Sequence, residues 1–166
     1  MIRTAILTVS DKGSRGERTD TSVGEIRALL ESGPFAERDY HIVPDEQAMI
    51  RAKLRLWADG GHIDLILTTG GTGLALRDRT PEATREVLER EVPGLAELMR
   101  FAGVQKNPKA ALSRAVCGVR GKTLIVNLPG SPKGARESLE AILSVLPHAV
   151  DTITGELREA PEDWHQ

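Results

Sequence analysis

The chain has 166 residues, of which 40% are hydrophobic, 28% are charged and 3% are aromatic, and its formal net charge is −2. This length suits one domain, residues 1–166, and the balance of apolar and charged residues excludes disorder as the default state. A near-neutral charge with so few aromatic rings also excludes the usual nucleic-acid-binding surfaces, which need basic patches or stacking rings.

The expected compartment is the cytoplasm. Cys117 is the single cysteine of the sequence, which excludes an internal disulfide and fits a reducing environment. The apolar N-terminal stretch is too short for a signal peptide, and no run approaches the roughly 20 apolar residues of a membrane span. We therefore expect a cytoplasmic protein with neither a membrane nor a nucleic acid as partner.

Short apolar runs alternate with helical patterns along the chain. Near-continuous apolar strands between helices are typical of a mostly parallel sheet that is covered by helices on both faces. We therefore predict an α/β fold, a three-layer sandwich with a mostly parallel central sheet. An additional edge strand is expected within residues 113–121. The four runs predicted as buried strands are 4–9, 40–43, 64–68 and 123–128.

Apolar residues at helical spacing predict the helices between these strands. Thr80 and Ser131, each followed by proline, have the pattern of helix starts, with Thr80 as N-cap. Pro147 is expected to kink or restart the last helix. The tail from about residue 159 is polar and is expected to be loosely held, with Trp164 as a candidate for docking. The helical patterns cover residues 23–30, 49–57, 95–99 and 139–146.

A glycine- and threonine-rich loop follows the predicted strand 64–68. In open α/β sheets, ligands collect outside the carboxyl ends of the strands, where this loop lies. Three glycines allow a tight backbone whose N–H groups face an oxyanion, and the threonine hydroxyls add donors. A plain flexible turn is the alternative, and we favour the anion cradle. The loop consists of Thr69, Gly70, Gly71, Thr72 and Gly73.

Two aspartates, Asp45 and Asp78, are expected at adjacent strand ends. Asp45 follows the second strand and Asp78 precedes a predicted helix, so each has helix capping as its structural alternative. Thr80 suits the cap beside Asp78, which leaves that carboxylate for a ligand. Together the two aspartates would hold Mg²⁺ through few direct ligands plus water and substrate phosphates, as nucleotidyl transfer requires. Arg77 and Arg79 either neutralise phosphate or only solvate the loop.

Two further loops lie at strand ends. The polar loop that begins with Ser10 and Asp11 is either an ordinary connection or a functional loop. Pro129, Gly130 and Ser131 close the fourth strand and open a helix, which favours a second anion site. Two anion-binding loops in one small sheet indicate one or two ligands with several phosphates.

Five ordered motifs resemble the MogA/MoaB molybdopterin-binding family. This resemblance runs from about residue 6 to residue 152. It implies a three-layer α/β fold, usually a homotrimer, that binds molybdopterin and often ATP. The motifs are TVSDKGSRG at 8–16, TTGGTG at 68–73, RDRTPEAT at 77–84, PGLAELMR at 93–100 and LSRAVCGVRGKTLIVNLPGSPKG at 112–134.

The adenylyltransferase branch of this family uses a molybdopterin phosphate to attack the α-phosphate of Mg-ATP, giving adenylyl-molybdopterin and pyrophosphate. Its two required aspartates match Asp45, in P-D-E-Q, and Asp78, before T-P-E-A-T. The loop 69–73 matches a pterin or phosphate contact. The other substrate-binding positions implied by the resemblance are Ser10, Asp11, Thr80, Ser113, Arg114, Pro129, Gly130 and Ser131.

The resemblance leaves two hypotheses. The first is a molybdopterin adenylyltransferase with Mg²⁺, ATP and molybdopterin at the site, and with a molybdenum insertion enzyme as a candidate partner. The second is a non-catalytic molybdopterin-binding carrier or trimeric interaction module of the same fold. The P-D-E-Q motif at Asp45 favours the enzyme, whereas the length of the chain does not separate the subfamilies.

Overall fold

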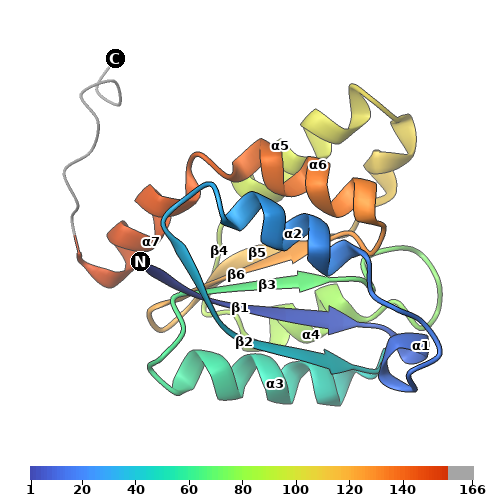
Figure 1. Cartoon of the computed structure of the whole chain (residues 1–166), viewed down its shortest axis with the longest axis horizontal. Helices are drawn as coiled ribbons and strands as arrows, with labels where there is room; N and C mark the ends of the chain where they lie inside the picture. Colours follow the sequence, from blue (N-terminus) through green and yellow to red (C-terminus); the bar gives the residue numbers. More distant parts are fainter. Residues whose placement is uncertain (157–166) are drawn as a thin grey trace.

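A six-stranded sheet lies between two layers of helices in the computed structural model, which describes residues 1–156 (Figure 1). The strand order is β2-β1-β3-β6-β5-β4, and the first four strands of this order run parallel. This confirms the predicted three-layer α/β fold. The strands are β1 (Ile2–Val9), β2 (Phe35–Val43), β3 (Leu65–Thr69), β4 (Arg90–Glu91), β5 (Cys117–Arg120) and β6 (Thr123–Leu128).

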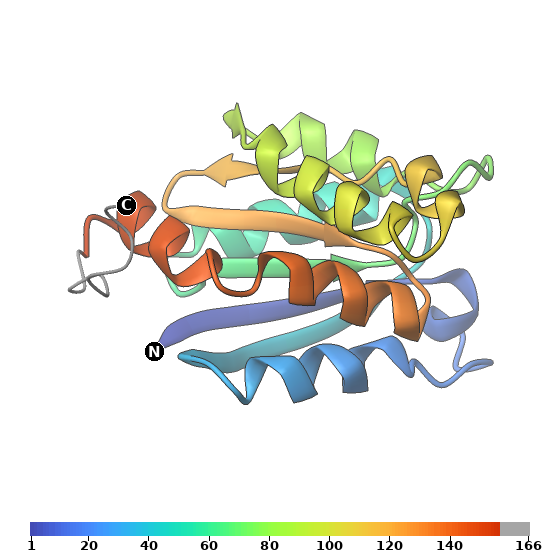
Figure 2. The same ribbon diagram turned by 90° about the horizontal axis from the view of Figure 1, so that it is seen from above.

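The helices divide between the two faces of the sheet. In this list each helix has its bounds: α1 (Asp11–Ser14), α2 (Ser22–Leu30), α3 (Gln47–Asp59), α4 (Thr80–Val87), α5 (Pro93–Val104), the 3-10 helix η1 (Pro108–Leu112), α6 (Pro132–Ile142) and α7 (Leu146–Thr154). Helices α3 and α4 cover one face, and α2, α6 and α5 lie side by side on the other (Figures 1 and 2). Within residues 1–156, no helix is long and apolar enough to traverse a lipid bilayer.

Strand β3 illustrates why the central strands read as unbroken apolar runs. Leu65 and Leu67 pack into the core under α2 and α6, whereas Ile66 packs into the core under α3 and α4. All three side chains are fully buried. Because successive strand residues point to opposite faces, a strand covered on both sides needs apolar residues at every position.

The edge of the sheet differs from the expectation. Strand β5, which lies within the predicted segment 113–121, pairs antiparallel with β6 on one side and with β4 on the other, so it is not the edge strand. The edge on this side of the sheet is β4, whose two residues, Arg90 and Glu91, are charged and exposed, and the opposite edge is β2. A strand of this length carries no alternating pattern, which is why the sequence did not predict it.

Two helix starts have different outcomes. Ser131 is the N-cap of α6, where its Oγ accepts a hydrogen bond from the Gly134 N–H at 3.0 Å. The prediction of Thr80 as N-cap is wrong, because Arg79 holds that position and the Thr80 hydroxyl donates to the Gly70 carbonyl oxygen at 2.9 Å. Pro147 restarts the helix, since α6 ends at Ile142 and α7 begins at Leu146. The polar tail from residue 159, with Trp164, lies outside the described residues.

Candidate functional site

The loops after β1, β2, β3 and β6 lie together at the carboxyl ends of the strands (Figure 1). Residues of these loops line two adjoining cavities. The carboxylate cavity, of about 330 Å³, has Asp20, Asp45, Asp78, Gly70 and Gly71 in its wall. The apolar cavity, of about 490 Å³, lies under α5 and η1. Ser131 lines both cavities, so the two cavities adjoin at this residue.

The glycine loop that follows β3 has a backbone open only to glycine at two positions. Gly70 and Gly71 have φ values of +102° and +70°, in the left-handed region that other residues rarely adopt. A Cβ at Gly70 would come within 2.3 Å of the Val9 carbonyl oxygen, and a Cβ at Gly71 within 2.3 Å of Thr80 Oγ1. The loop therefore packs directly against β1 and the start of α4, with Thr80 as a brace behind it.

Some hydrogen-bond donors of this loop already have a partner within the protein, and others have none among the described residues. The Thr69 hydroxyl donates to the Pro129 carbonyl oxygen at 2.7 Å, which joins the loops after β3 and β6. By contrast, in the part of the chain that the structure describes, the N–H groups of Gly71, Thr72 and Gly73 donate no hydrogen bond. Three free N–H groups in succession provide a binding surface for an anion.

Asp45 lies between the end of β2 and α3. The N-cap of α3 is Glu46, so the capping alternative for Asp45 does not apply. Its Oδ2 accepts a hydrogen bond from the Asp11 N–H at 3.0 Å, and its Oδ1 has no partner among residues 1–156. Burial raises the pKa of Asp45, the Asp11 N–H opposes this change, and the charges of Asp11 and Asp78 reinforce it.

Asp78 has the same arrangement as Asp45. Its Oδ2 accepts a hydrogen bond from the Ala75 N–H at 3.0 Å, and within the described residues its Oδ1 accepts none. Both carboxylates line the carboxylate cavity, and each is partly buried. Each side chain is thus oriented by a backbone N–H and presents one carboxyl oxygen without a partner among the described residues.

The donor set suits a hard cation that brings most of its own ligands. Over residues 1–156 there is no group of three or more His, Cys, Asp or Glu side chains arranged to hold a metal. Mg²⁺ is commonly bound by one or two carboxylates plus water and substrate phosphates. The free Oδ1 atoms of Asp45 and Asp78 fit that pattern, whereas a structural zinc site would need four protein ligands.

Ser10 and Asp11, the two predicted residues of the loop after β1, have different roles. Ser10 lines the carboxylate cavity, and its Oγ caps α1 by accepting from the Gly13 N–H at 3.0 Å. Asp11 is outside the lining of both cavities and is held by Arg77 at 2.7 and 3.0 Å. The hydrogen bonds from Arg77 lower the pKa of Asp11.

Of the next two predicted residues, Arg114 has a structural role and Ser113 lines a cavity. The Arg114 guanidinium donates to the carbonyl oxygens of Gly73 and Asp78, at 2.8 and 2.7 Å, and also pairs with Glu82. Its donors therefore hold the loop that carries Asp78. Ser113, the neighbouring residue, lines the apolar cavity.

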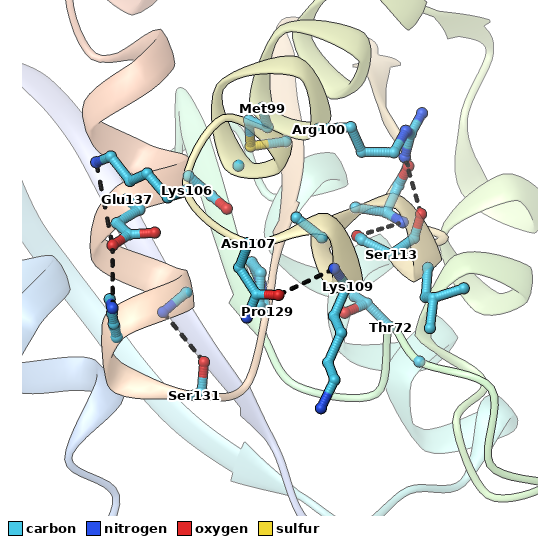
Figure 3. Close-up of a pocket in the computed structure, with 18 of the residues that line it drawn as sticks. Thr72, Met99, Arg100, Lys106, Asn107, Lys109, Ser113, Pro129, Ser131 and Glu137 are labelled. Carbon is cyan, nitrogen blue, oxygen red and sulfur yellow. Dashed lines mark hydrogen bonds and ion pairs between the residues drawn. The ribbon is translucent and has the colours of Figure 1, made fainter.

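The apolar cavity is lined by two predicted site residues, Ser113 and Pro129, and by residues that the sequence analysis did not assign to a site, among them Met99 and Asn107 (Figure 3). Met99, from α5, and Pro129 contribute apolar surface, and Asn107 and Ser113 contribute polar groups. At its rim, Lys106 and the Lys133 of α6 each lie 4.0 Å from Glu137. The PGLAELMR motif marks this region of α5 but not which of its residues face a cavity.

Asp20 is the other residue that the sequence analysis missed. Its carboxylate lines the carboxylate cavity and accepts hydrogen bonds from the Ser22 N–H at 3.0 Å and from the Thr8 hydroxyl. The signal available in the sequence was its place two residues before the first residue of a helix, which also fits an ordinary cap.

Comparisons with known proteins agree on one family. Residues 5–148 match the family described as "Probable molybdopterin binding domain". The chain is 42% identical over 163 residues to molybdopterin adenylyltransferase from Helicobacter pylori J99, covering 97% of this chain and 93% of the relative. The enzyme of that name from Escherichia coli K12 is 42% identical over 144 residues, covering 85% and 73%.

The structure also resembles solved structures closely. The crystal structure of the molybdopterin biosynthesis enzyme MoaB from Thermus thermophilus superposes with a TM-score of 0.90 at 68% identity, covering 94% of this chain and 98% of that chain. A MogA structure superposes with a TM-score of 0.86 at 40% identity, covering 91% and 99%.

Proposed function

The chain belongs to the molybdopterin-binding domain family, and from this premise we propose that it is a molybdopterin adenylyltransferase of molybdenum cofactor biosynthesis. It transfers AMP from Mg-ATP to the phosphate of molybdopterin and releases pyrophosphate. The supporting relatives carry that name and match nearly the whole chain.

The arrangement of Asp45 and Asp78 is the main structural support. Two carboxylates face one cavity, each with Oδ2 held by a backbone N–H and Oδ1 free. A carrier that only binds the pterin has no need for a pair of oriented, partly buried carboxylates, because their mutual repulsion is unfavourable without a cation. The enzyme is therefore the better explanation of this site.

The transfer chemistry needs no proton acceptor. A phosphate monoester loses its second proton with a pKa of about 6, so at neutral pH the molybdopterin phosphate is already a nucleophile. Its oxygen forms a bond to the α-phosphorus of ATP, the bond from that phosphorus to the bridging oxygen breaks, and pyrophosphate leaves with the electron pair. No histidine lines either cavity in residues 1–156, which agrees with this chemistry.

Mg²⁺ would be held by the free oxygens of Asp45 and Asp78. When bound, it neutralises charge on the triphosphate. The side chains themselves fix its place, because their Oδ2 atoms are already bonded to backbone N–H groups. The free N–H group of Gly71, in the carboxylate cavity, would hold a phosphate of the nucleotide, whereas Thr72 and Gly73 line the apolar cavity, where their free N–H groups would face the other substrate.

The apolar cavity suits the pterin. Met99 and Pro129 offer flat apolar contact to a heterocycle, and Asn107 and Ser113 offer hydrogen bonds to its edge. Ser131, which borders both cavities, lies where the pterin phosphate would meet the nucleotide. The two cavities thus correspond to the two substrates.

Pyrophosphate release is the direct test. We expect release from Mg-ATP when molybdopterin is present, one pyrophosphate for each adenylyl-molybdopterin, with almost none when molybdopterin or Mg²⁺ is omitted. Molybdopterin binding without pyrophosphate release would contradict the enzyme and favour the carrier. Release from ATP alone would instead indicate a nucleotide hydrolase.

The assembly belongs to the same proposal. We propose a single-domain cytoplasmic enzyme that forms a homotrimer and passes its product to a molybdenum insertion enzyme. Leu98, Phe101 and Leu112, on α5 and η1, are 40%, 65% and 55% exposed, and such apolar side chains are suited to an interface. Sedimentation analysis that gives one chain per particle would contradict the trimer.

A further inference from the structure

We propose that Asp11 and Arg77 form a clamp that positions Asp45 for binding magnesium–ATP. The inference rests on the proposed function, and it makes Asp11 and Arg77 positioning residues that act through Asp45. We use "clamp" for the Asp11 side chain, the Arg77 guanidinium and the backbone N–H groups of Asp11 and Asp45.

Asp11 and Asp45 hold each other by reciprocal hydrogen bonds. The Asp11 N–H donates to Asp45 Oδ2 at 3.0 Å, and the Asp45 N–H donates to Asp11 Oδ1 at 3.0 Å. Each carboxylate therefore fixes the backbone that carries the other. Asp45 is restrained both at its main chain and at one side-chain oxygen, which leaves only Oδ1 for a cation.

Arg77 completes the clamp from a third loop. Its Nη2 donates to Asp11 Oδ1 at 2.7 Å and its Nε donates to Oδ2 at 3.0 Å, in a bidentate pair. Strands β2, β1 and β3 are neighbours in the sheet, and Asp45, Asp11 and Arg77 lie in the loops that follow them. One carboxylate thus ties together the loops at three adjacent strand ends.

The charge balance explains why an arginine is needed. Asp11 brings a negative charge close to Asp45, which is itself close to Asp78. Without the guanidinium of Arg77 beside it, the carboxylate of Asp11 would repel the carboxylate of Asp45 and favour a different loop position. The guanidinium neutralises Asp11 while its planar fork fixes the carboxylate orientation, which a flexible ammonium group does less well.

The clamp is expected to affect position more than folding. The Arg77 side chain is 59% exposed, and exposed ion pairs contribute little to the stability of a fold. Substitution of residues that support metal ligands nevertheless commonly lowers metal affinity by roughly 10- to 100-fold. A large effect on magnesium–ATP binding with little change in melting temperature would therefore separate positioning from general stabilisation.

The segment that carries Asp11 also offers a control ion pair. Arg15 makes a bidentate pair with Glu17, with both distances 3.0 Å, and the two side chains are 56% and 54% exposed. Neither residue has a hydrogen bond to Asp45 within the described chain, and neither lines a cavity. Replacing Arg15 removes a bidentate ion pair that makes no side-chain hydrogen bond to the clamp. The charge of Arg15 also acts on Asp11, so this control includes the loss of one nearby positive charge.

The test compares Asp11→Asn, Arg77→Gln and the double variant with Arg15→Gln. Titration calorimetry gives the dissociation constants of magnesium–ATP and, separately, of molybdopterin. We expect the clamp variants to bind magnesium–ATP roughly 10-fold more weakly and to bind molybdopterin as the wild type does. The double variant should lose no more affinity for magnesium–ATP than the single variant that binds it less tightly, because both substitutions open one clamp. Arg77→Lys should recover part of the loss.

Three results would overturn the clamp. The first is that Arg77→Gln binds magnesium–ATP as tightly as Arg15→Gln does. The second is that Asp11→Asn weakens molybdopterin binding as much as magnesium–ATP binding, which would indicate a direct contact with molybdopterin. The third is that the wild type does not bind magnesium–ATP. A wild type that binds magnesium–ATP but releases no pyrophosphate would contradict the adenylyl transfer alone and leave the clamp comparison valid.

Discussion

Thr80 Oγ1 occupies the space into which a side chain on residue 71 would point, and the Thr80 N–H donates to the Gly71 carbonyl oxygen at 3.1 Å. The start of α4 is therefore in direct contact with the glycine loop. This contact couples the position of the free loop N–H groups to the helix that follows Asp78.

Gly71→Ala is expected to damage both the loop and the fold. The substitution places a Cβ 2.3 Å from Thr80 Oγ1 at a φ of +70°. Left-handed strain alone costs about 1–3 kcal/mol, so thermal unfolding should show a fall in melting temperature of several degrees together with loss of pyrophosphate release.

Gly24→Ala, in α2, is the control for this prediction. A Cβ at Gly24 has no atom within 4 Å, and alanine is the better helix former. Its melting temperature should be equal or higher, with activity unchanged. Equal stability of the two variants would show that residue 71 does not need glycine.

Asp45→Asn and Asp78→Asn are expected to lower the rate of pyrophosphate release by roughly 100-fold or more. Metal-ion stabilisation of developing charge is worth several kcal/mol, and each 1.4 kcal/mol or so is a factor of ten. Both variants should keep the wild-type far-ultraviolet circular dichroism, because each retains the Oδ acceptor for its backbone N–H. Asp59→Asn, which only loosens an exposed pair with Arg120, serves as control. Undiminished turnover of Asp78→Asn would remove that residue from the site.

That Asp45 and Asp78 line one cavity could be predicted in part from topology, because both loops follow parallel strands. The expectation of adjacent strand ends is wrong, since β1 lies between β2 and β3. The carboxyl ends of parallel strands meet at one edge of the sheet, so residues just after such strands become neighbours whatever their separation in sequence. The buried strands β1, β3 and β6 were recognisable for a related reason, since a strand such as β3 that is covered on both faces is largely apolar. The prediction of 40–43 as a buried strand is wrong, because β2 lies at an edge of the sheet and most of its side chains are exposed or partly buried.

The role of Thr80 could not be predicted, because a local pattern and a tertiary contact compete for the same side chain. Threonine before proline has the pattern of an N-cap, but its hydroxyl instead bonds to Gly70, ten residues earlier. Asp11 is a similar case: its partners Asp45 and Arg77 are 34 and 66 residues away in sequence. Only the folded chain reveals which polar residues are already occupied by one another.

Asn127→Ala should be strongly destabilising, although the residue lies in an otherwise apolar strand. Asn127 is fully buried; its Nδ2 donates to the hydroxyls of Thr68 and Thr84, and its Oδ1 accepts from the Val116 N–H at 3.1 Å. Alanine would leave the Val116 N–H and the Thr68 hydroxyl unpaired in the core, at a cost of about 2–4 kcal/mol, whereas the Thr84 hydroxyl would keep its bond to the Thr80 carbonyl oxygen. Urea unfolding measures this loss, and Thr152→Ala, which removes one exposed hydroxyl on α7, should change stability by only a few tenths of a kcal/mol. A loss as small as that of Thr152→Ala would contradict the importance of the network.

Cys117 is expected to be inert in the native protein and to make stability depend on alkaline pH. Burial raises the pKa of its thiol from 9.0 to about 12. Because the folded state holds the proton more tightly than the unfolded state, the contribution is fully present below pH 9 and is lost as the pH rises toward 12.

Iodoacetamide at pH 8 should therefore leave Cys117 unmodified until urea is added, as measured by mass spectrometry, because the thiolate is the reactive form. Cys117→Ala should be less stable than wild type at pH 7 because a buried side chain is truncated, and the difference should narrow between pH 9 and pH 11. Both proteins share all other titrating groups, so the narrowing isolates the thiol. Rapid alkylation of the folded protein at pH 8, or a stability difference that is constant with pH, would contradict the burial of Cys117 in the core between the sheet and α5.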